Sequence, residues 1–417
     1  MRDSREGLAQ AAADVLIAND TGVFVKPGPG QYPGQWNWDS ALITIGLSHI
    51  DANRARAEVR SLLTGQWEDG MIPHIVFHSR EVEYFPGPET WGRAKGAPRV
   101  ATSGITQPPL LASAVRRLHE RHPSKGFLRE VVPALERWHV WFQSRRSDEE
   151  SLVAILHPWE SGMDNSPRFD RALARVGGSG TEFTRRDLVH VAAEQRPTDP
   201  DYAVYVTILE TLREGEYRPS IEDAPFSVGD VFLTAVLARA EADLAWLWHE
   251  MGESGAEAEA RSESLRAAIE STWHQAKSLY TDAGGDDEPA TIAAVLPMIA
   301  GVGGDRSERL VAALIDPSRF GPTSSAPWYP TSVAKDDPRF DARRYWRGPV
   351  WVNINWLLIT GLEDAGYEKE AIGLETRTLD LVSENGFWEY YDPHTGQGLG
   401  CGRFSWTAAV VLDLCRR

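Results

Sequence analysis

The chain is poor in cysteine and in basic residues, and it has no long apolar run. Only 2 of its 417 residues are Cys, which excludes a disulfide framework, and Cys401 and Cys415 lack the spacing of metal ligands. No apolar run approaches the roughly 18 residues of a membrane-spanning helix, so we expect no membrane partner. Lys and Arg number 43 against 60 Asp and Glu, for a formal net charge of −17. This charge argues against nucleic-acid binding, which needs a basic face.

The N-terminus lacks a signal-peptide core. Residues 1–7 contain four charged side chains, the first at the second residue, and we therefore expect a cytoplasmic protein. With 42% hydrophobic and 25% charged residues, the composition is that of a globular protein, which excludes wholesale disorder. What is abundant is tryptophan, at 16 residues. This surplus needs an explanation.

Helical periodicity dominates, and two kinds of helix alternate along the chain. Segments 52–63 and 368–382 are amphipathic with a heavily charged face. Segments 40–50, 350–362 and 405–414 are apolar nearly all round, as is typical of helices buried on every side. Strands are poorly represented. Further amphipathic segments lie near residues 5–18, 108–120, 126–145, 201–214, 229–252 and 256–277. The pattern predicts an all-α protein in which an inner ring of helices is wrapped by an outer ring, an α/α toroid.

Long connections rich in proline, glycine and aromatic residues separate these helices. They occupy residues 20–39, 67–106, 156–200 and 280–346. Connections of this length within a compact domain are usually functional or contain short elements of their own. No Ser/Gly-rich linker divides the chain, so we predict a single domain over residues 1–417.

Three of the buried helices are each preceded directly by an aromatic or polar cluster. The clusters are QYPGQWNWD at 31–39, RYWRGP at 344–349 and GRF at 402–404. If the three helices run parallel in an inner ring, the loops before them emerge at the same end. The clusters should therefore converge on one mouth of the toroid.

A mouth of this composition suits a sugar. Sugar rings have apolar faces that stack on Trp and Tyr, and hydroxyls that need polar partners. Asp39, next to Trp36 and Trp38, supplies that mixture. Asp39 could also be the N-cap of the helix that we expect to begin at Ser40, and the two roles are compatible.

Two carboxyl groups stand out as candidates for chemistry. Hydrolysis of a glycosidic bond needs one carboxyl as acid and one as base. Asp164 lies in the polar-aromatic stretch HPWESGMDNSP, and Glu389 lies among four aromatic residues in GFWEYYDP. Glu160 competes with Asp164 in the first stretch, and Asp392 competes with Glu389 in the second. Composition does not choose between them.

No motif indicates a metal or a nucleotide cofactor. The spacing of His157, Glu160 and Asp164 matches no standard metal site. Glycines alternate over residues 396–402, but no strand is predicted before them, so we expect a flexible rim rather than a dinucleotide site.

Five motifs together resemble glycoside hydrolase family 63, in the family's order, from about residue 20 to the C-terminus. The likeness is to its compact bacterial branch, the mannosylglycerate and glucosylglycerate hydrolases. The motifs are WNWD at 36–39, WESGMDNSP at 159–167, YWRGPVW at 345–351, EYYDP at 389–393 and FSWTAA at 404–409.

The resemblance implies an (α/α)6 barrel and hydrolysis of α-glycosides with inversion, without a cofactor. It implies Asp164 as general acid and Glu389 as general base, with carboxyl groups roughly 6.5–9.5 Å apart. Arg196 would hold the glycerate carboxylate, since an arginine fork binds a carboxylate bidentately. The alternative is a surface arginine on an exposed loop. Residues 177–200 would fold over the mouth.

The resemblance also implies which side chains bind the substrate. Trp36, Trp38 and Asp39 would hold the sugar, and Tyr84 and Tyr202 would assist Arg196. Tyr345, Trp346 and Trp351 would build an aromatic wall. The remaining predicted contacts are Tyr32, Gln107 and Trp159. We interpret the tryptophan surplus as this wall, with Trp388 included.

The sequence thus predicts a glycoside hydrolase that acts on a small anionic sugar derivative, glucosylglycerate or mannosylglycerate, and releases hexose and glycerate. Two alternatives stay open: a hydrolase of a neutral α-glucoside or disaccharide on the same fold, and a carbohydrate-binding protein without turnover. Glucose and mannose differ in one hydroxyl orientation, which one hydrogen bond can select. A homo-oligomer is also left open.

Overall fold

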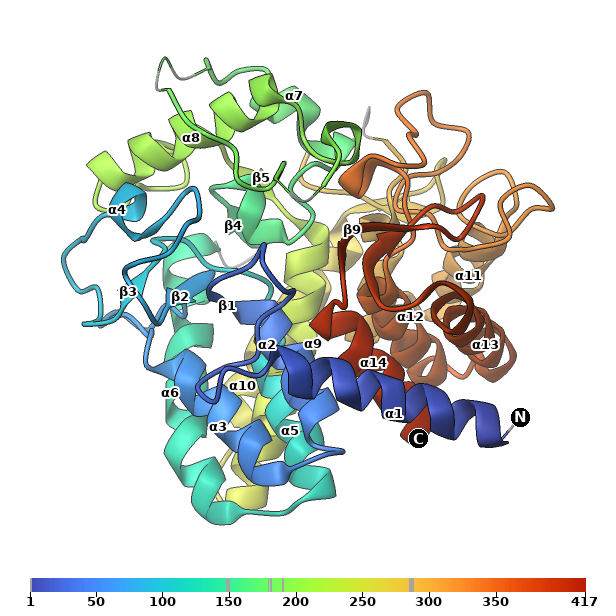
Figure 1. Cartoon of the computed structure of the whole chain (residues 1–417). Coiled ribbons are helices and arrows are strands. Elements are labelled where there is room, and N and C mark those ends of the chain that lie inside the picture. The colour runs from blue at the N-terminus through green and yellow to red at the C-terminus, as the bar shows by residue number, and fades with distance from the viewer. Residues whose placement is uncertain (1, 148–150, 179, 181, 190, 285–288) are drawn as a thin grey trace.

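The structure is a computed structural model and describes residues 2–147, 151–178, 180, 182–189, 191–284 and 289–417. Helices fill most of the described chain (Figure 1). They are α1 (Arg2–Asn19), α2 (Asn37–Leu47), α3 (Ala52–Leu63), α4 (Pro88–Trp91), α5 (Leu111–Arg121), α6 (Lys125–Arg146), α7 (Asp170–Leu173), α8 (Asp199–Glu214), α9 (Val231–Met251), α10 (Ala256–Ser271), α11 (Ser307–Ile315), α12 (Val352–Asp364), α13 (Glu368–Asn385) and α14 (Ser405–Arg416). The predicted helical character is confirmed.

Six segments contact one another in a closed order. Helix α2 packs against α5, α5 against α9, α9 against the 3-10 segment η5 (Leu296–Ala300), η5 against α12, α12 against α14, and α14 against α2. The helices predicted to be buried on every side belong to this ring, and every residue of α2 is buried. Apolar side chains from Ala9 to Leu414 form one large continuous core.

The charged helices lie against this ring. Helix α1 packs on α14, α3 on α2, α6 and α10 on α9, and α13 on α12. Figure 1 shows α1 lying across α14, so the two ends of the chain are close together. The predicted alternation is confirmed in part: α1, α3, α6, α10 and α13 lie outside the ring as expected, whereas α5 and α9, predicted to be amphipathic, belong to the ring. No helix of the described residues is long and apolar enough to span a membrane.

Helix starts follow local chemistry. Helix α3 covers the predicted range, because Asp51 accepts hydrogen bonds from the amides of Asn53 and Arg54 as its N-cap. Helix α2 begins at Asn37, three residues before the predicted Ser40, since the chain turns helical directly after strand β1. Asp39 therefore lies in the first turn, and its predicted alternative role as N-cap is wrong.

Short strands occur in the long connections. β1 (Gln35–Trp36), β2 (Ile75–Phe77) and β3 (Ala101–Thr102) form an antiparallel sheet. The other strands form antiparallel pairs: β4 (Ala154–Ile155) with β5 (Val228–Gly229), β6 (Trp273–His274) with β7 (Leu279–Tyr280), and β8 (Trp388–Tyr391) with β9 (Gly398–Gly402). In Figure 1, β4, β5, α4 and α8 lie in the upper part of the molecule, and β1 to β3 lie below them at about mid-height.

The alternating glycines do not form a flexible rim. Strand β8 precedes them and pairs with β9, so the prediction that no strand precedes them is wrong. Gly398 has no room for a side chain, because a Cβ there would lie 2.0 Å from the Trp388 ring. The glycines instead allow Trp388 to pack across the hairpin.

A buried carboxylate near the C-terminal end of α14 joins several inner helices. Asp413 of α14 lies 3.0 Å from Nε2 of His49 and accepts a hydrogen bond of 2.9 Å from Nε1 of Trp356 on α12. Arg417 donates to it at 3.3 Å, and Nη1 of Arg117 on α5 lies 3.7 Å away. One buried acid thus connects three inner helices at the end away from their N-termini.

Candidate active site

A cavity opens where the N-terminal ends of α2, α12 and α14 meet. Its lining includes Asp39 in the first turn of α2, Tyr345 in the loop before α12, and Phe404 directly before α14. The predicted convergence of the three clusters on one mouth is confirmed. The predicted site residues that line the cavity are Tyr32, Trp36, Trp38, Asp39, Tyr84, Gln107, Trp159, Asp164, Arg196, Tyr202, Tyr345 and Glu389.

Three of the predicted wall tryptophans lie behind the lining instead. Trp346 stacks on Trp351 with ring centroids 3.7 Å apart, and Trp351 stacks on Tyr390 at 4.5 Å. Trp346 and Trp351 are each about 1% exposed. Trp388 packs in the β8–β9 hairpin. Trp346 and Trp351 contact the Tyr345 ring from behind, so part of the tryptophan surplus is core, contrary to the prediction.

Asp164 is placed by a short 3-10 turn, η1 (Pro158–Ser161), and the loop after it. His157 caps this turn, because its Nδ1 accepts a hydrogen bond of 3.1 Å from the amide of Trp159. Gly162 follows with φ of 68°, and a Cβ there would lie 2.9 Å from the Trp38 ring, so glycine is required on both counts. The hydroxyl of Tyr205 donates to the main-chain oxygen of Asp164 at 2.8 Å.

The Asp164 carboxyl is buried and has no partner among the other described side chains. Burial raises its pKa to about 7, and the nearby negative charge of Glu389 adds to this effect, while the Asp164 amide and Arg196 act against it. A substantial fraction of Asp164 is therefore protonated at neutral pH. That is the state a proton donor needs.

Glu389 is aimed into the cavity by an irregularity in the β8–β9 hairpin. Trp388 pairs with Gly402 and Tyr390 with Leu399, so the register shifts at Glu389. Such bulges turn a side chain out of the regular alternation. Gly400 has φ of 70°, and a Cβ there would lie 2.5 Å from Oε2 of Glu389. The space that Glu389 occupies thus depends on a glycine opposite it.

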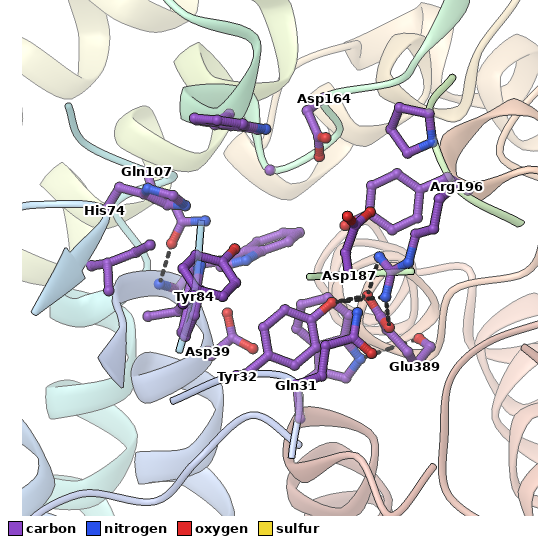
Figure 2. Close-up of a pocket in the computed structure, with 18 of the residues that line it drawn as sticks. Gln31, Tyr32, Asp39, His74, Tyr84, Gln107, Asp164, Asp187, Arg196 and Glu389 are labelled. Atoms are coloured by element: carbon purple, nitrogen blue, oxygen red, sulfur yellow. Dashed lines mark hydrogen bonds and ion pairs between the residues drawn. The ribbon is translucent and has the colours of Figure 1, made fainter. Parts of the chain in front are cut away.

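Both oxygens of Glu389 are occupied. Arg196 donates to Oε2 at 2.8 Å and to Oε1 at 3.2 Å. Tyr32 donates to Oε1 at 2.7 Å, and the amide of Cys401 donates to Oε2 at 3.0 Å. Figure 2 shows Arg196 and Tyr32 meeting at Glu389, with Asp164 on another side of the cavity.

Arg196 is not a surface residue. It is 3% exposed, and its guanidinium lies over the Tyr345 ring, 4.8 Å from the centroid. Burial alone would lower its pKa, but the Glu389 carboxylate outweighs burial and raises the pKa well above the usual value. Arg196 is therefore a permanent cation inside the cavity, and the surface alternative is wrong.

The competing carboxylates have structural partners. Glu160 accepts hydrogen bonds from Arg146 at 2.8 Å and from the amide of Leu156 at 2.6 Å. Asp392 pairs with Arg343 at 3.0 Å and caps the turn that follows. Neither is among the residues that line the cavity. Within the described part of the chain, no group of His, Cys, Asp and Glu is arranged to hold a metal ion.

The cavity is rich in acid. Besides Asp164 and Glu389 it contains Asp39 and Asp187. Burial, and then the charge of Glu389, raise the pKa of Asp39 well above its ordinary value. Asp187 is paired with Arg185, whose Nε donates to it at 3.0 Å. Arg196 is thus greatly outnumbered by carboxyl groups.

Some lining residues were not predicted. Gln31 lines the cavity with both side-chain amide atoms buried and without a partner among the described residues. His74 also lines it and stacks on Trp159 with centroids 6.2 Å apart. Gln31 is the first residue of the 31–39 cluster, which could have suggested it. His74 and Asp187 lie in long connections without a motif, so no sequence signal marked them.

Comparison with known proteins agrees with this geometry. A family model described as the mannosylglycerate hydrolase MGH1-like glycoside hydrolase domain matches residues 32–407. The chain belongs to this glycoside hydrolase family. This hydrolase is 41% identical to the mannosylglycerate hydrolase of Thermus thermophilus, over 96% of the chain and 99% of the relative. It is 37% identical to the glucosylglycerate hydrolase of Mycolicibacterium hassiacum, over 97% of each protein.

A solved structure is similar over the whole fold. The crystal structure of the GH63 mannosylglycerate hydrolase from Thermus thermophilus in complex with Tris and D-glycerate superposes with a TM-score of 0.90 at 39% identity. The match covers 98% of this hydrolase and 100% of that chain. The resemblance to glycoside hydrolase family 63 is confirmed.

Proposed function

We propose that the protein hydrolyses the α-glycosidic bond of mannosylglycerate or glucosylglycerate, releasing hexose and glycerate. The observation that carries the proposal is a buried carboxyl, Asp164, with a pKa of about 7, in one cavity with a second carboxylate and a buried arginine. Relatives named for hydrolysis of these two glycosides, at about 40% identity over nearly the whole chain, support it.

The two carboxyl groups divide the chemistry. Asp164 donates its proton to the oxygen that joins the sugar to glycerate, and this oxygen takes the electron pair of the breaking bond. A water molecule attacks the anomeric carbon from the opposite face, and Glu389 accepts a proton from it. The product has the inverted anomeric configuration. Inversion requires the carboxyl groups to lie roughly 6.5–9.5 Å apart in the substrate complex.

The substrate is held at two places in this proposal. Trp36, Trp38 and Trp159 offer rings to the sugar, and Asp39 offers a carboxyl to its hydroxyls. Arg196 receives the glycerate carboxylate, beside the hydroxyls of Tyr84 and Tyr202. A buried arginine in an otherwise acidic cavity supports an anionic substrate over a neutral one, because an arginine fork matches a carboxylate.

The fold and the absence of a cofactor complete the proposal. The closed order of α2, α5, α9, η5, α12 and α14 supports an (α/α)6 barrel, and the continuous core supports a single domain over the chain. Acid–base hydrolysis of a glycoside uses two carboxyl groups alone, so we propose that no cofactor or metal is needed.

The test is release of hexose from purified protein. Mannosylglycerate, glucosylglycerate and a neutral α-glucoside are compared, and proton NMR follows the anomer that appears first. We expect release from at least one glycerate glycoside with inversion; release from neither would contradict the proposal. Arg196→Ala should lose activity selectively on the glycerate glycoside. An equal effect on the neutral glucoside would favour the neutral-substrate alternative.

A further inference from the structure

The contact between Arg196 and Glu389 conflicts with the proposed roles of both. Oε1 accepts hydrogen bonds from Arg196 and Tyr32, and Oε2 accepts from Arg196 and the Cys401 amide. A carboxylate has about four lone-pair sites. All of them are therefore used, and none is left to accept a proton from water. In the same state, both terminal nitrogens of Arg196 are engaged by Glu389, so a substrate carboxylate can pair with the two of them only in its place.

Little besides Glu389 holds the Arg196 guanidinium in this position. Its Nε is buried without a partner among the described residues. Apart from Glu389, the acceptor of its hydrogen bonds among the described residues is the hydroxyl of Tyr32, at 3.0 Å. It also lies over the rings of Tyr345 and, at 6.0 Å, Tyr390, on which a guanidinium can slide without losing a directional bond. Arg196 can thus leave Glu389 if another carboxylate takes its place.

We propose that the substrate's own carboxylate draws Arg196 away from Glu389 and so releases the base; this inference rests on the proposed function. One bidentate arginine–carboxylate pair replaces another, so the exchange is nearly balanced. A neutral aglycone offers only hydroxyls, which cannot compete with Glu389 for a guanidinium. An anionic aglycone therefore raises kcat in addition to affinity. Arg196 thus makes the rate of the chemical step, and not only substrate binding, depend on the aglycone carboxylate.

A glycosyl fluoride separates this effect from substrate binding. It fills the sugar position and leaves the glycerate position free, so D-glycerate can be added as a separate molecule. Water attacks the anomeric carbon, the carbon–fluorine bond breaks with its electron pair leaving on fluoride, and Glu389 accepts the proton from water. Hexose, fluoride ion and a proton result. Fluoride leaves without protonation, so the rate reports on the base and not on Asp164.

The experiment measures fluoride release from α-mannosyl or α-glucosyl fluoride, whichever matches the glycoside that the protein hydrolyses. We expect saturating D-glycerate to raise kcat by about 10²-fold or more, since a general base contributes about 10²–10⁴-fold. Glycerol, which has no carboxylate, should leave kcat unchanged. An unchanged or lower rate with D-glycerate would overturn the inference, and so would an equal increase with glycerol.

Two variants identify the residue responsible. In Arg196→Ala, the ratio of rates with and without D-glycerate should fall to about one, whatever the rate itself. Tyr32→Phe, which removes the other side-chain donor to Glu389, is the matched control and should keep the response. A response that persists in Arg196→Ala would overturn the inference, because D-glycerate would then act through another group.

The same preparation keeps the two proposals apart. If it hydrolyses the glycerate glycoside but its fluoride hydrolysis does not respond to D-glycerate, the proposed function stands and the exchange of Arg196 is wrong. If it hydrolyses no glycerate glycoside, the proposed function itself is contradicted.

Discussion

The two ends of the inner helices both bury carboxylates against arginine, with opposite results. Burial would raise the pKa of Asp413, but the hydrogen bond from His49 and the charges of Arg117 and Arg417 hold it well below the usual range. At the mouth, burial raises the pKa of Asp164 to about 7, and the single Arg196 is engaged by Glu389. Cations outnumber the acid at one end, and acids outnumber the cation at the other. The balance of charges, not burial alone, decides which carboxyl keeps a proton for chemistry.

The largest difference between the ends should appear in turnover. Asp164→Asn and Glu389→Gln should each lower kcat on the glycerate glycoside by about 10²–10⁴-fold, because each removes an acid–base group. Asp413→Asn should keep its turnover per folded molecule, since Asp413 lies away from the cavity. Steady-state kinetics at 25 °C, with circular dichroism to verify folding, checks this.

A glycosyl fluoride then distinguishes the acid from the base. With saturating D-glycerate present, Asp164→Asn should retain most fluoride hydrolysis, because fluoride leaves without a proton, whereas Glu389→Gln should lose it. A variant that keeps more than about a tenth of wild-type activity on the glycerate glycoside excludes that residue from acid–base catalysis.

Removal of the carboxylate should change the free energy of unfolding in opposite directions at the two ends of the inner helices. At pH 7, Asp413→Asn should lower the free energy of unfolding by about 1–3 kcal/mol, because it removes a buried carboxylate to which His49, Trp356 and Arg417 are hydrogen-bonded. The folded-state pKa of Asp413 is depressed, so its contribution is present above the unfolded pKa of about 4 and is lost as the pH falls below it.

At the mouth, Asp164→Asn should instead raise the free energy of unfolding at high pH. The folded-state pKa of Asp164 is raised, so its ionisation destabilises the folded protein increasingly as the pH rises from about 4 to about 7. Asp164→Asn lacks this cost and should be more stable than wild type at pH 8 but not at pH 4. Urea unfolding at the two pH values measures both variants, and a loss of stability in Asp164→Asn at pH 8 would contradict the charge comparison.

The smallest expected effect is on the pH dependence of activity. Activity on the glycerate glycoside should fall as the pH rises through about 7, because the fraction of protonated Asp164 decreases tenfold per unit above its pKa. Hydrolysis of the fluoride should lack this alkaline limb. The same limb in both profiles would show that a group other than Asp164 produces it.

Much of the fold was accessible to sequence reasoning because helical periodicity is a local signal. Residues 52–63 form α3 as predicted, and the apolar stretch before residue 414 forms α14. The strands were missed because most have two or three residues, too few for an alternating pattern. Strand β8 was missed because its aromatic residues are buried from both sides and show no alternation.

The site could be predicted from the sequence only where its residues belong to motifs. Asp164, Glu389 and Asp39 were found in this way, and the structure brings them to one cavity. Trp346 and Trp351 belong to the same motifs but stack behind the lining. A motif indicates which side chains belong to the site region. It does not distinguish a ring that lines the cavity from a ring that packs behind the lining. His74 and Asp187 carry no motif at all.

By itself, the sequence determined the helices, the order of the motifs and the pair of carboxyl groups proposed for the chemistry, because each depends on residue types at short spacing. The tertiary structure decided the contacts between distant segments. Arg196 and Glu389 are 193 residues apart in the chain, and no spacing rule could predict that one would occupy both oxygens of the other. The same packing raises the pKa of Asp164 and lowers that of Asp413. A pKa depends on the charges and the solvent around the group, and folding sets these surroundings.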